Sequence, residues 1–196
     1  MEPALVNVGR TMLLLIDMQR RLMPAIYDSE NVVARSVRLA EAARLLDVSV
    51  YATEQYPAGL GPTIEALADY PREIVAKTAF SAASDPAVSA LLPASAGEIA
   101  IAGCEAHVCV LQTALDLVAR QHRVLLVADA IGSRDPADRA AAIDRARQHG
   151  VEVVTSEMVL FEWLRDARHP KFSEVNRLVK LACPQTSGGP QAFRSG

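Results

Sequence analysis

EIAIAGCEAHVCVLQTALDLV, residues 98–118, reads as a buried strand that breaks at Gly103 and restarts as a helix with Cys109 near its beginning. The short apolar run 98–102 suits a strand covered on both faces. From Val108 onward the apolar residues recur at helical spacing, so one stripe of the helix faces a core. A thiol in the first turn of that helix lies beside unpaired N–H groups and the positive end of the helix dipole, which favour the thiolate. The position alone leaves two interpretations of Cys109 open, a nucleophile or a small buried residue.

The composition predicts one well-packed domain. The chain has 196 residues, 51% of them hydrophobic and 22% charged, and we assign residues 1–182 to a single domain. Residues 183–196 are rich in Gly, Pro, Ser and Gln and are predicted to form a flexible tail or a subunit contact.

Charge and hydropathy exclude several classes of partner. A net charge of −3 without a basic cluster argues against nucleic acid and favours a small-molecule ligand. The first apolar run, residues 12–16, is too short to span a membrane, so we expect no membrane partner and a cytoplasmic protein. The three cysteines are an odd number, which implies no disulfide framework and leaves thiols free to react.

Strand-like and helix-like segments alternate along the chain. The predicted strands are residues 11–16, 48–53, 74–76, 98–102, 123–128 and 151–155. The predicted helices are residues 31–46, a short one ending at 68, 87–92, one starting near 108, one from 136 to Gly150, 157–164 and 171–182, the last two packed on an edge. This alternation indicates an α/β fold, a three-layer α/β/α sandwich around a six-stranded, mostly parallel, doubly wound sheet.

Four chemically capable residues follow predicted strands: Asp17, Lys77, Cys109 and Asp129. In a doubly wound sheet the ligand crevice lies beyond the carboxyl ends of the strands, so these side chains are expected to converge. Asp17 is placed to accept the thiol proton and Lys77 to stabilise the charges beside it. Backbone N–H groups between Gly103 and Cys109 can receive an oxyanion. We interpret Asp129 as a structural carboxylate that binds the next loop.

Each candidate also has a structural interpretation. Asp17 can cap a turn, and Lys77 can be a solvated strand end. His107 suggests a Cys–His dyad, but residues two apart point away from one another on a helix. Cys104 is expected to pack at the strand end, and its spacing from Cys109 matches no common zinc pattern. A dinucleotide site is disfavoured because no Gly-x-Gly-x-x-Gly turn follows the first strand.

Three segments carry a resemblance to a known family. LLLIDMQ (13–19), KTAFS (77–81) and GCEAHVCV (103–110) resemble the segments that hold the Asp, Lys and Cys of the isochorismatase-like cysteine hydrolases, a superfamily related to nicotinamidases. TEQYPAGLGPT (53–63) and HPKFSEVNRLVK (169–180) are similar to its branch of YcaC and isochorismatase-domain-containing proteins.

The resemblance implies a mechanism and a set of roles. Asp17 would be the general base, Lys77 its electrostatic partner and Cys109 the nucleophile that forms a thioester acyl-enzyme. The resemblance also implies a cis peptide between Cys104 and Glu105 that directs the N–H groups of Glu105 and Cys109 at the oxyanion. A homo-oligomer is implied as well.

The chain departs from nicotinamidases after the second strand. Those enzymes place metal-binding Asp and His residues there, whereas this chain has Glu54, Gln55 and Tyr56, so we expect no metal and no cofactor. We expect substrate contacts from Gln19, Tyr56, Phe80 and Glu105.

These observations predict a cysteine-dependent hydrolase that cleaves a C–N bond of a small amide. One alternative is a catalytically silent binding or scaffold protein. Another is noncovalent, isochorismatase-type hydrolysis of a substrate such as a vinyl ether, with Asp17 as the acid. Isochorismatases that cleave vinyl ethers replace the cysteine, so Cys109 disfavours this second alternative.

Overall fold

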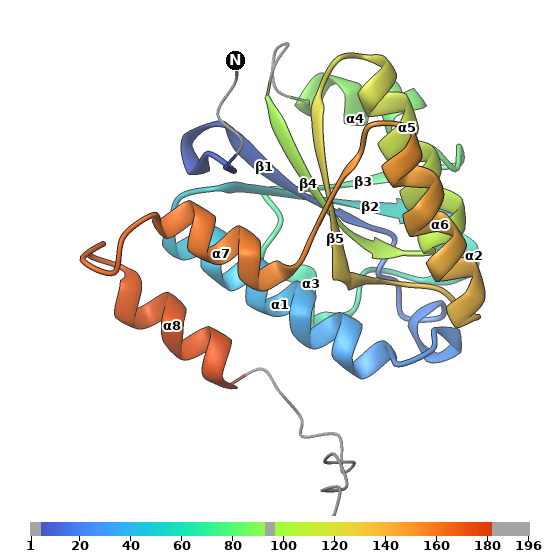
Figure 1. Ribbon diagram of the computed structural model, residues 1–196. Coiled ribbons are helices and arrows are strands. Elements are labelled where there is room, and N and C mark those ends of the chain that lie inside the picture. Colours follow the sequence, from blue (N-terminus) through green and yellow to red (C-terminus); the bar gives the residue numbers. More distant parts are fainter. Residues whose placement is uncertain (1–4, 93–96, 182–196) are drawn as a thin grey trace, which may run out of the picture.

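The computed structural model describes residues 5–92 and 97–181 and holds a six-stranded parallel sheet between two layers of helices (Figure 1). The strand order is β3-β2-β1-β4-β5-β6, and every neighbouring pair is parallel. The strands are β1 (Thr11–Ile16), β2 (Ser49–Gln55), β3 (Glu73–Lys77), β4 (Glu98–Cys104), β5 (Arg123–Gly132) and β6 (Glu152–Val154). The predicted α/β/α sandwich with a doubly wound sheet is confirmed.

Both faces of the sheet are covered by helices. The helices are α1 (Ser29–Leu45), α2 (Pro57–Leu60), α3 (Glu65–Ala68), α4 (Pro86–Leu91), α5 (Leu111–Ala119), α6 (Pro136–Gln148), α7 (Ser156–Leu164) and α8 (Phe172–Leu181). Figure 1 shows α1 and α7 over one face and α5 and α6 over the other. Strand β1 contributes side chains to the cores on both faces of the sheet. Leu13 and Leu15 lie in the core beneath α1, and Leu14 and Ile16 lie in the core beneath α5. The six residues of β1 are all buried, as predicted for a central strand.

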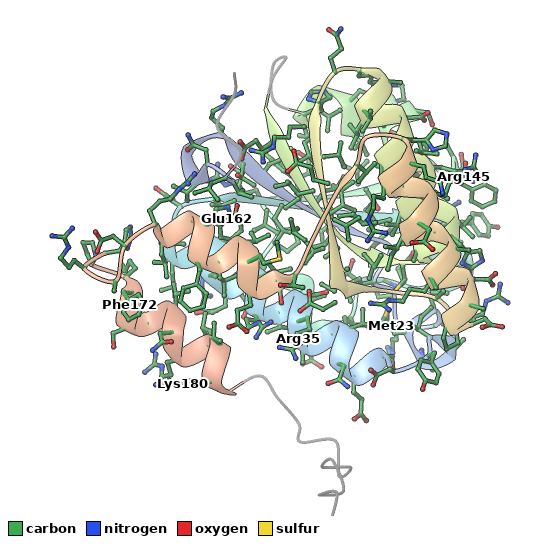
Figure 2. The ribbon with its side chains drawn as sticks, in the orientation of Figure 1. Met23, Arg35, Arg145, Glu162, Phe172 and Lys180 are labelled. Carbon is green, nitrogen blue, oxygen red and sulfur yellow. The ribbon has the colours of Figure 1, made fainter. Side chains whose placement is uncertain are left out.

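The last two helices do not pack on a sheet edge, so that expectation is wrong. Both α7 and α8 contact α1, and they extend the helical layer on that face (Figure 1). Phe172 at the start of α8 is partly buried against the core beneath α1 (Figure 2). The apolar stripe of α8 therefore packs on a helix.

The topological switch point lies between β1 and β4. From β1 the chain moves outward through β2 and β3, then returns to β4 on the other side of β1. Gly103 pairs with Ile16 at this point and has φ of +126°. A Cβ on Gly103 would lie 2.1 Å from the carbonyl oxygen of Ile16, so only glycine lets the two strand ends approach this closely. The residues after β1 and β4 are thereby brought together.

Four strands extend beyond their predicted ends, and β3 and β4 do so by one and two residues, to Lys77 and Cys104. Strand β2 continues to Gln55, which pairs with Lys77, and β5 continues to Gly132, which pairs with Cys104. At the end of β2 backbone pairing persists although the side chains turn polar, whereas β5 continues past Asp129 with the buried apolar residues Ala130 and Ile131. Asp129 consequently lies inside β5 and does not end it.

The predicted tail and the prediction that no segment crosses a membrane have different outcomes. The predicted tail, residues 183–196, lies outside the described residues. Among the helices of residues 5–92 and 97–181, none combines the length and apolarity needed to cross a membrane.

Candidate active site

A fully buried ion pair lies at the carboxyl edge of the sheet. Asp17 follows β1 and has φ of +50°, a left-handed conformation that ends the strand. Lys77 is the last residue of β3, and its Nζ lies 2.7 Å from Oδ2 of Asp17. The exposed fractions of the two side chains are 1% for Asp17 and 0% for Lys77. Because charges are costly to bury, such a pair marks a candidate functional site.

Cys109 adjoins this pair from the other side of the switch point. It lies in a π-helical turn, Ala106–Val110, that joins β4 to α5. Its thiol interacts with both the Asp17 carboxylate and the Lys77 ammonium. Cys109 keeps 6% of its surface exposed, whereas Cys104 keeps none. The structure thus brings Asp17, Lys77 and Cys109 together, with the sulfur as the member most open to solvent.

The surroundings of Cys109 favour the neutral form of the resting thiol, against the effect of the helix end considered from the sequence. Burial raises the pKa of Cys109 to about 12, the Asp17 carboxylate raises it further, and the Lys77 ammonium opposes the rise. The local effect of the helix end is outweighed because the π-helical turn packs the sulfur into the protein. Attack by this sulfur therefore requires a partner that takes its proton.

The segment that leads to Cys109 is held by a salt bridge. The peptide bond between Cys104 and Glu105 is cis. The carboxylate of Glu105 accepts a 2.9 Å hydrogen bond from Nε of Arg134, in the loop after β5. The N–H groups of Val108 and Val110 both donate to the carbonyl of Glu105. Glu105 is thus fixed at the entrance to the turn, and its carboxylate is paired with a cation.

His107 does not form a dyad with Cys109. Its Nδ1 lies 3.0 Å from Oγ of Ser133, and its Nε2 lies 3.6 Å from the carboxylate of Asp138. The ring is directed toward β5 and α6, as the spacing of two residues predicts.

The other predicted contact residues have different environments. Gln19 is fully buried, and its amide nitrogen donates to the carbonyls of Gln55 and Gly61. In this structure its side chain has no exposed surface and supports the neighbouring loop, and its contact with a substrate stays a prediction. Tyr56 and Phe80 are 59% and 54% exposed beside Lys77. The N–H of Tyr56 donates to the Lys77 carbonyl, and the Phe80 carbonyl accepts from Lys77 Nζ.

Two residues of β2 belong to the cluster and were not predicted. The hydroxyl of Thr53 donates to Oδ1 of Asp17 at 2.7 Å. The amide oxygen of Gln55 accepts from Lys77 Nζ at 2.7 Å and lies 4.0 Å from Sγ of Cys109. Their spacing of two residues puts them on one face of the strand. Polar residues at alternate positions at the end of an apolar strand were the signal that could have identified them.

Asp129 has structural contacts, but its partners lie on α1 and at the start of α7 and not, as was predicted, in the loop after its own strand. Its carboxylate accepts from the N–H and the hydroxyl of Ser156 and pairs with Arg35 and Arg38. Arg35 lies on α1 (Figure 2).

A cavity of about 330 Å³ lies beside Asp129. It is lined by Tyr27, Asp28, Asn31, Val32, Arg35, Asp129, Ile131, Ser133, Pro136 and Arg139. None of these lining residues is Asp17, Lys77 or Cys109, so the cavity is separate from the cluster. Within the described part of the chain, no three His, Cys, Asp or Glu side chains form a group that could hold a metal.

Comparison with known proteins identifies the family. The isochorismatase domain matches residues 11–158. The chain therefore belongs to the isochorismatase family of hydrolases, which confirms the resemblance seen in its motifs.

Particular relatives cover nearly the whole chain. Isochorismatase domain-containing protein 2 from Danio rerio is 40% identical over 97% of this chain and 99% of its own. The structure of MAR1 ribonuclease from Caenorhabditis elegans is 35% identical, covers 96% of this chain and 99% of its own, and superposes with a TM-score of 0.87. YcaC from Escherichia coli, an octameric hydrolase of unknown specificity, shares the fold at 23% identity and a TM-score of 0.75, over 92% of this chain and 98% of its own.

Proposed function

We propose that this chain is a cysteine-dependent hydrolase that cleaves a C–N bond of a small amide through a thioester acyl-enzyme. The observation that carries the proposal is the buried Asp17–Lys77 pair against the thiol of Cys109. A nucleophile, a base within reach and a cation that orients the base are the parts that covalent catalysis requires.

In the first half-reaction the sulfur of Cys109 bonds to the amide carbonyl carbon while Asp17 takes the thiol proton. This coupled transfer suits a thiol that is neutral at rest. The carbonyl oxygen becomes an oxyanion, which we assign to the backbone N–H groups of Glu105 and Cys109. The C–N bond then breaks, and the leaving nitrogen receives the proton from Asp17. The product remains on the enzyme as a thioester.

In the second half-reaction water replaces the amine. Asp17 accepts a proton from the water as its oxygen bonds to the thioester carbonyl. The C–S bond then breaks, the sulfur recovers its proton from Asp17, and a carboxylic acid leaves. In the resting arrangement the ammonium of Lys77 lies 2.7 Å from the Asp17 carboxylate. We assign it the role of holding that carboxylate in place through both half-reactions. Tyr56 and Phe80 are proposed to cover the apolar part of the substrate.

The test is a hydrolysis screen with paired cysteine variants. Small amides and an RNA oligonucleotide are offered to the unmodified chain, to Cys109→Ala and to Cys104→Ala; the RNA is included because the C. elegans relative is named a ribonuclease. We expect amide hydrolysis by the unmodified chain and Cys104→Ala, with none by Cys109→Ala, and a covalent adduct on Cys109 by mass spectrometry. Hydrolysis retained by Cys109→Ala would refute the covalent mechanism and favour Asp17 as an acid. Saturable binding without turnover across the panel would favour the scaffold alternative.

We also propose a homo-oligomer in solution. The octameric state is that of the E. coli protein with the same fold, and α7 exposes Met158 and Phe161, which are 45% and 38% accessible. Light scattering on the purified chain measures the number of subunits, and a monomer across the concentration range would contradict this proposal.

A further inference from the structure

The ammonium of Lys77 is saturated with acceptors. It has three hydrogens, and four oxygens surround it: Oδ2 of Asp17 and Oε1 of Gln55 at 2.7 Å each, and the carbonyls of Ala79 and Phe80 at 3.3 Å each. A new acceptor can therefore reach this ammonium only by replacing one of the four. The two carbonyls are part of the backbone after β3, and the Asp17 carboxylate carries the compensating charge. Gln55 is the neutral side chain among them.

The orientation of the Gln55 amide is fixed by its surroundings. Its Nε2 donates to the carbonyl of Thr78 at 2.7 Å, which directs Oε1 at Lys77. The reverse orientation would place an NH₂ group against an ammonium and is excluded by that contact. The backbone of Gln55 is held as well, because the amide oxygen of Gln19 accepts its N–H and the amide nitrogen of Gln19 donates to its carbonyl. Gln19 thus clamps the residue that faces the ammonium.

The same oxygen of Gln55 faces the sulfur. Sγ of Cys109 lies 4.0 Å from Oε1, with the thiol as the donor. The charged groups that act on this thiol are Asp17 from the end of β1 and Lys77 from the end of β3. On the helical turn of Cys109 itself, the Glu105 carboxylate is paired with Arg134, and His107 is directed at Ser133 and Asp138. One amide oxygen therefore contacts the cation that stabilises a thiolate and also accepts from the neutral thiol.

We propose that Gln55 is a positioning residue that competes with the Cys109 sulfur for the Lys77 ammonium and so sets how readily the thiol ionises. With Gln55 in place, the ammonium hydrogen nearest to it is occupied and the thiol stays neutral. If that oxygen is removed, the freed hydrogen can turn to the sulfur, on which the ammonium already acts, and a stronger charged hydrogen bond to the thiolate favours ionisation. The catalytic part of this inference rests on the proposed function, whereas the ionisation part does not.

The test is the pH dependence of Cys109 alkylation by iodoacetamide, followed on the Cys109 peptide by mass spectrometry. Gln55→Leu removes the oxygen, and we expect the midpoint of the rate profile to move to lower pH, with alkylation about tenfold faster at pH 8. Gln55→Glu keeps an oxygen but adds a negative charge beside the sulfur, so the midpoint should move to higher pH. The matched control is Gln112→Leu, the same substitution at an exposed position on α5, which should leave the profile unchanged.

The opposite signs distinguish positioning from a structural role. Loosened packing would move Gln55→Leu and Gln55→Glu in the same direction, and that result, or unmoved midpoints, would overturn the proposal. If Gln55→Leu does not fold, Gln55→Asn withdraws the oxygen by one methylene and should give a smaller shift to lower pH; a shift to higher pH would overturn the proposal. If Cys109→Ala retained hydrolysis while the Gln55 variants shifted as expected, the proposed function would fail and this inference would stand.

Discussion

Replacing Lys77 by Met tests the buried ion pair at the centre of the site. Both side chains of the pair are almost fully buried, and Asp17 otherwise accepts from Thr53. Removing the cation leaves a carboxylate in the protein interior without its counter-charge. Loss of one partner of a buried pair typically costs about 3–5 kcal/mol. For a domain with about 5–15 kcal/mol of total stability, this is a large share of the free energy of unfolding.

The assay is urea unfolding at pH 7, with the free energy of unfolding taken from the midpoint and slope. The matched control is Lys171→Met, which removes an exposed lysine paired with Glu174 and should change the free energy by about 0.5 kcal/mol or less. The double variant Asp17→Asn with Lys77→Met removes both charges. It should be more stable than Lys77→Met alone by about 2 kcal/mol, because no isolated charge remains.

Two outcomes would refute this reasoning. A loss below about 1 kcal/mol in Lys77→Met would mean that the pair is solvated or open. A double variant no more stable than Lys77→Met would mean that the unpaired Asp17 charge is not the cause of the loss.

Three further changes probe the frame of the site. Gly103→Ala should cost more than about 4 kcal/mol or prevent folding, because its Cβ would overlap the Ile16 carbonyl; Gly9→Ala, whose nearest neighbour would be 3.5 Å away, is the control in thermal melts. Burial raises the pKa of Cys104 to about 12, so its contribution to stability is present below about pH 9, where the unfolded thiol is neutral, and is lost as pH rises toward 12. Between pH 8 and pH 10 this thiol should lower the free energy of unfolding by about 1.4 kcal/mol, and Cys104→Ala should remove that part of the pH dependence in urea unfolding. Asp129→Ala deprives Ser156 of its acceptor and should cost about 2 kcal/mol while Cys109 alkylation is unchanged; slower or faster alkylation would show that Asp129 belongs to the site.

The bounds of strands and helices could be predicted from the sequence where the hydropathy pattern matches the burial of the side chains. Strand β1 was predicted to the residue, because Thr11 followed by five apolar side chains in a row is typical of a strand buried on both faces. The end of β2 was missed because backbone pairing continues under polar side chains that a hydropathy pattern assigns to a loop. The end of β5 was missed because Asp129 interrupts the apolar run and the pairing resumes at Ile131 after a shift in register. Asp85 and Asp135 cap α4 and α6, and the predicted starts of these helices lie within one residue of the observed ones because capping is a local interaction.

Some features of the site could also be predicted from the sequence, and others could not. That Asp17, Lys77 and Cys109 would meet followed from strand ends and from the resemblance. That the Cys109 thiol would be neutral did not follow, because its pKa depends on burial by elements distant in the sequence. The inward orientation of Gln19 depends on the return of the loop after β2, since its amide bonds Gln55 and Gly61. Non-local packing decides each of these features.

Lys77 is carried by β3, which pairs only with β2 and forms one margin of the described sheet. Along this strand Glu73, Ile74 and Ala76 are exposed, so little apolar surface anchors it. Fraying of this outermost strand would carry the cation away from Asp17 while the central strands stay intact. As the denaturant concentration rises, catalytic activity should therefore be lost before the whole protein unfolds. The difference between the two midpoint concentrations would measure how stably β3 is attached to the sheet.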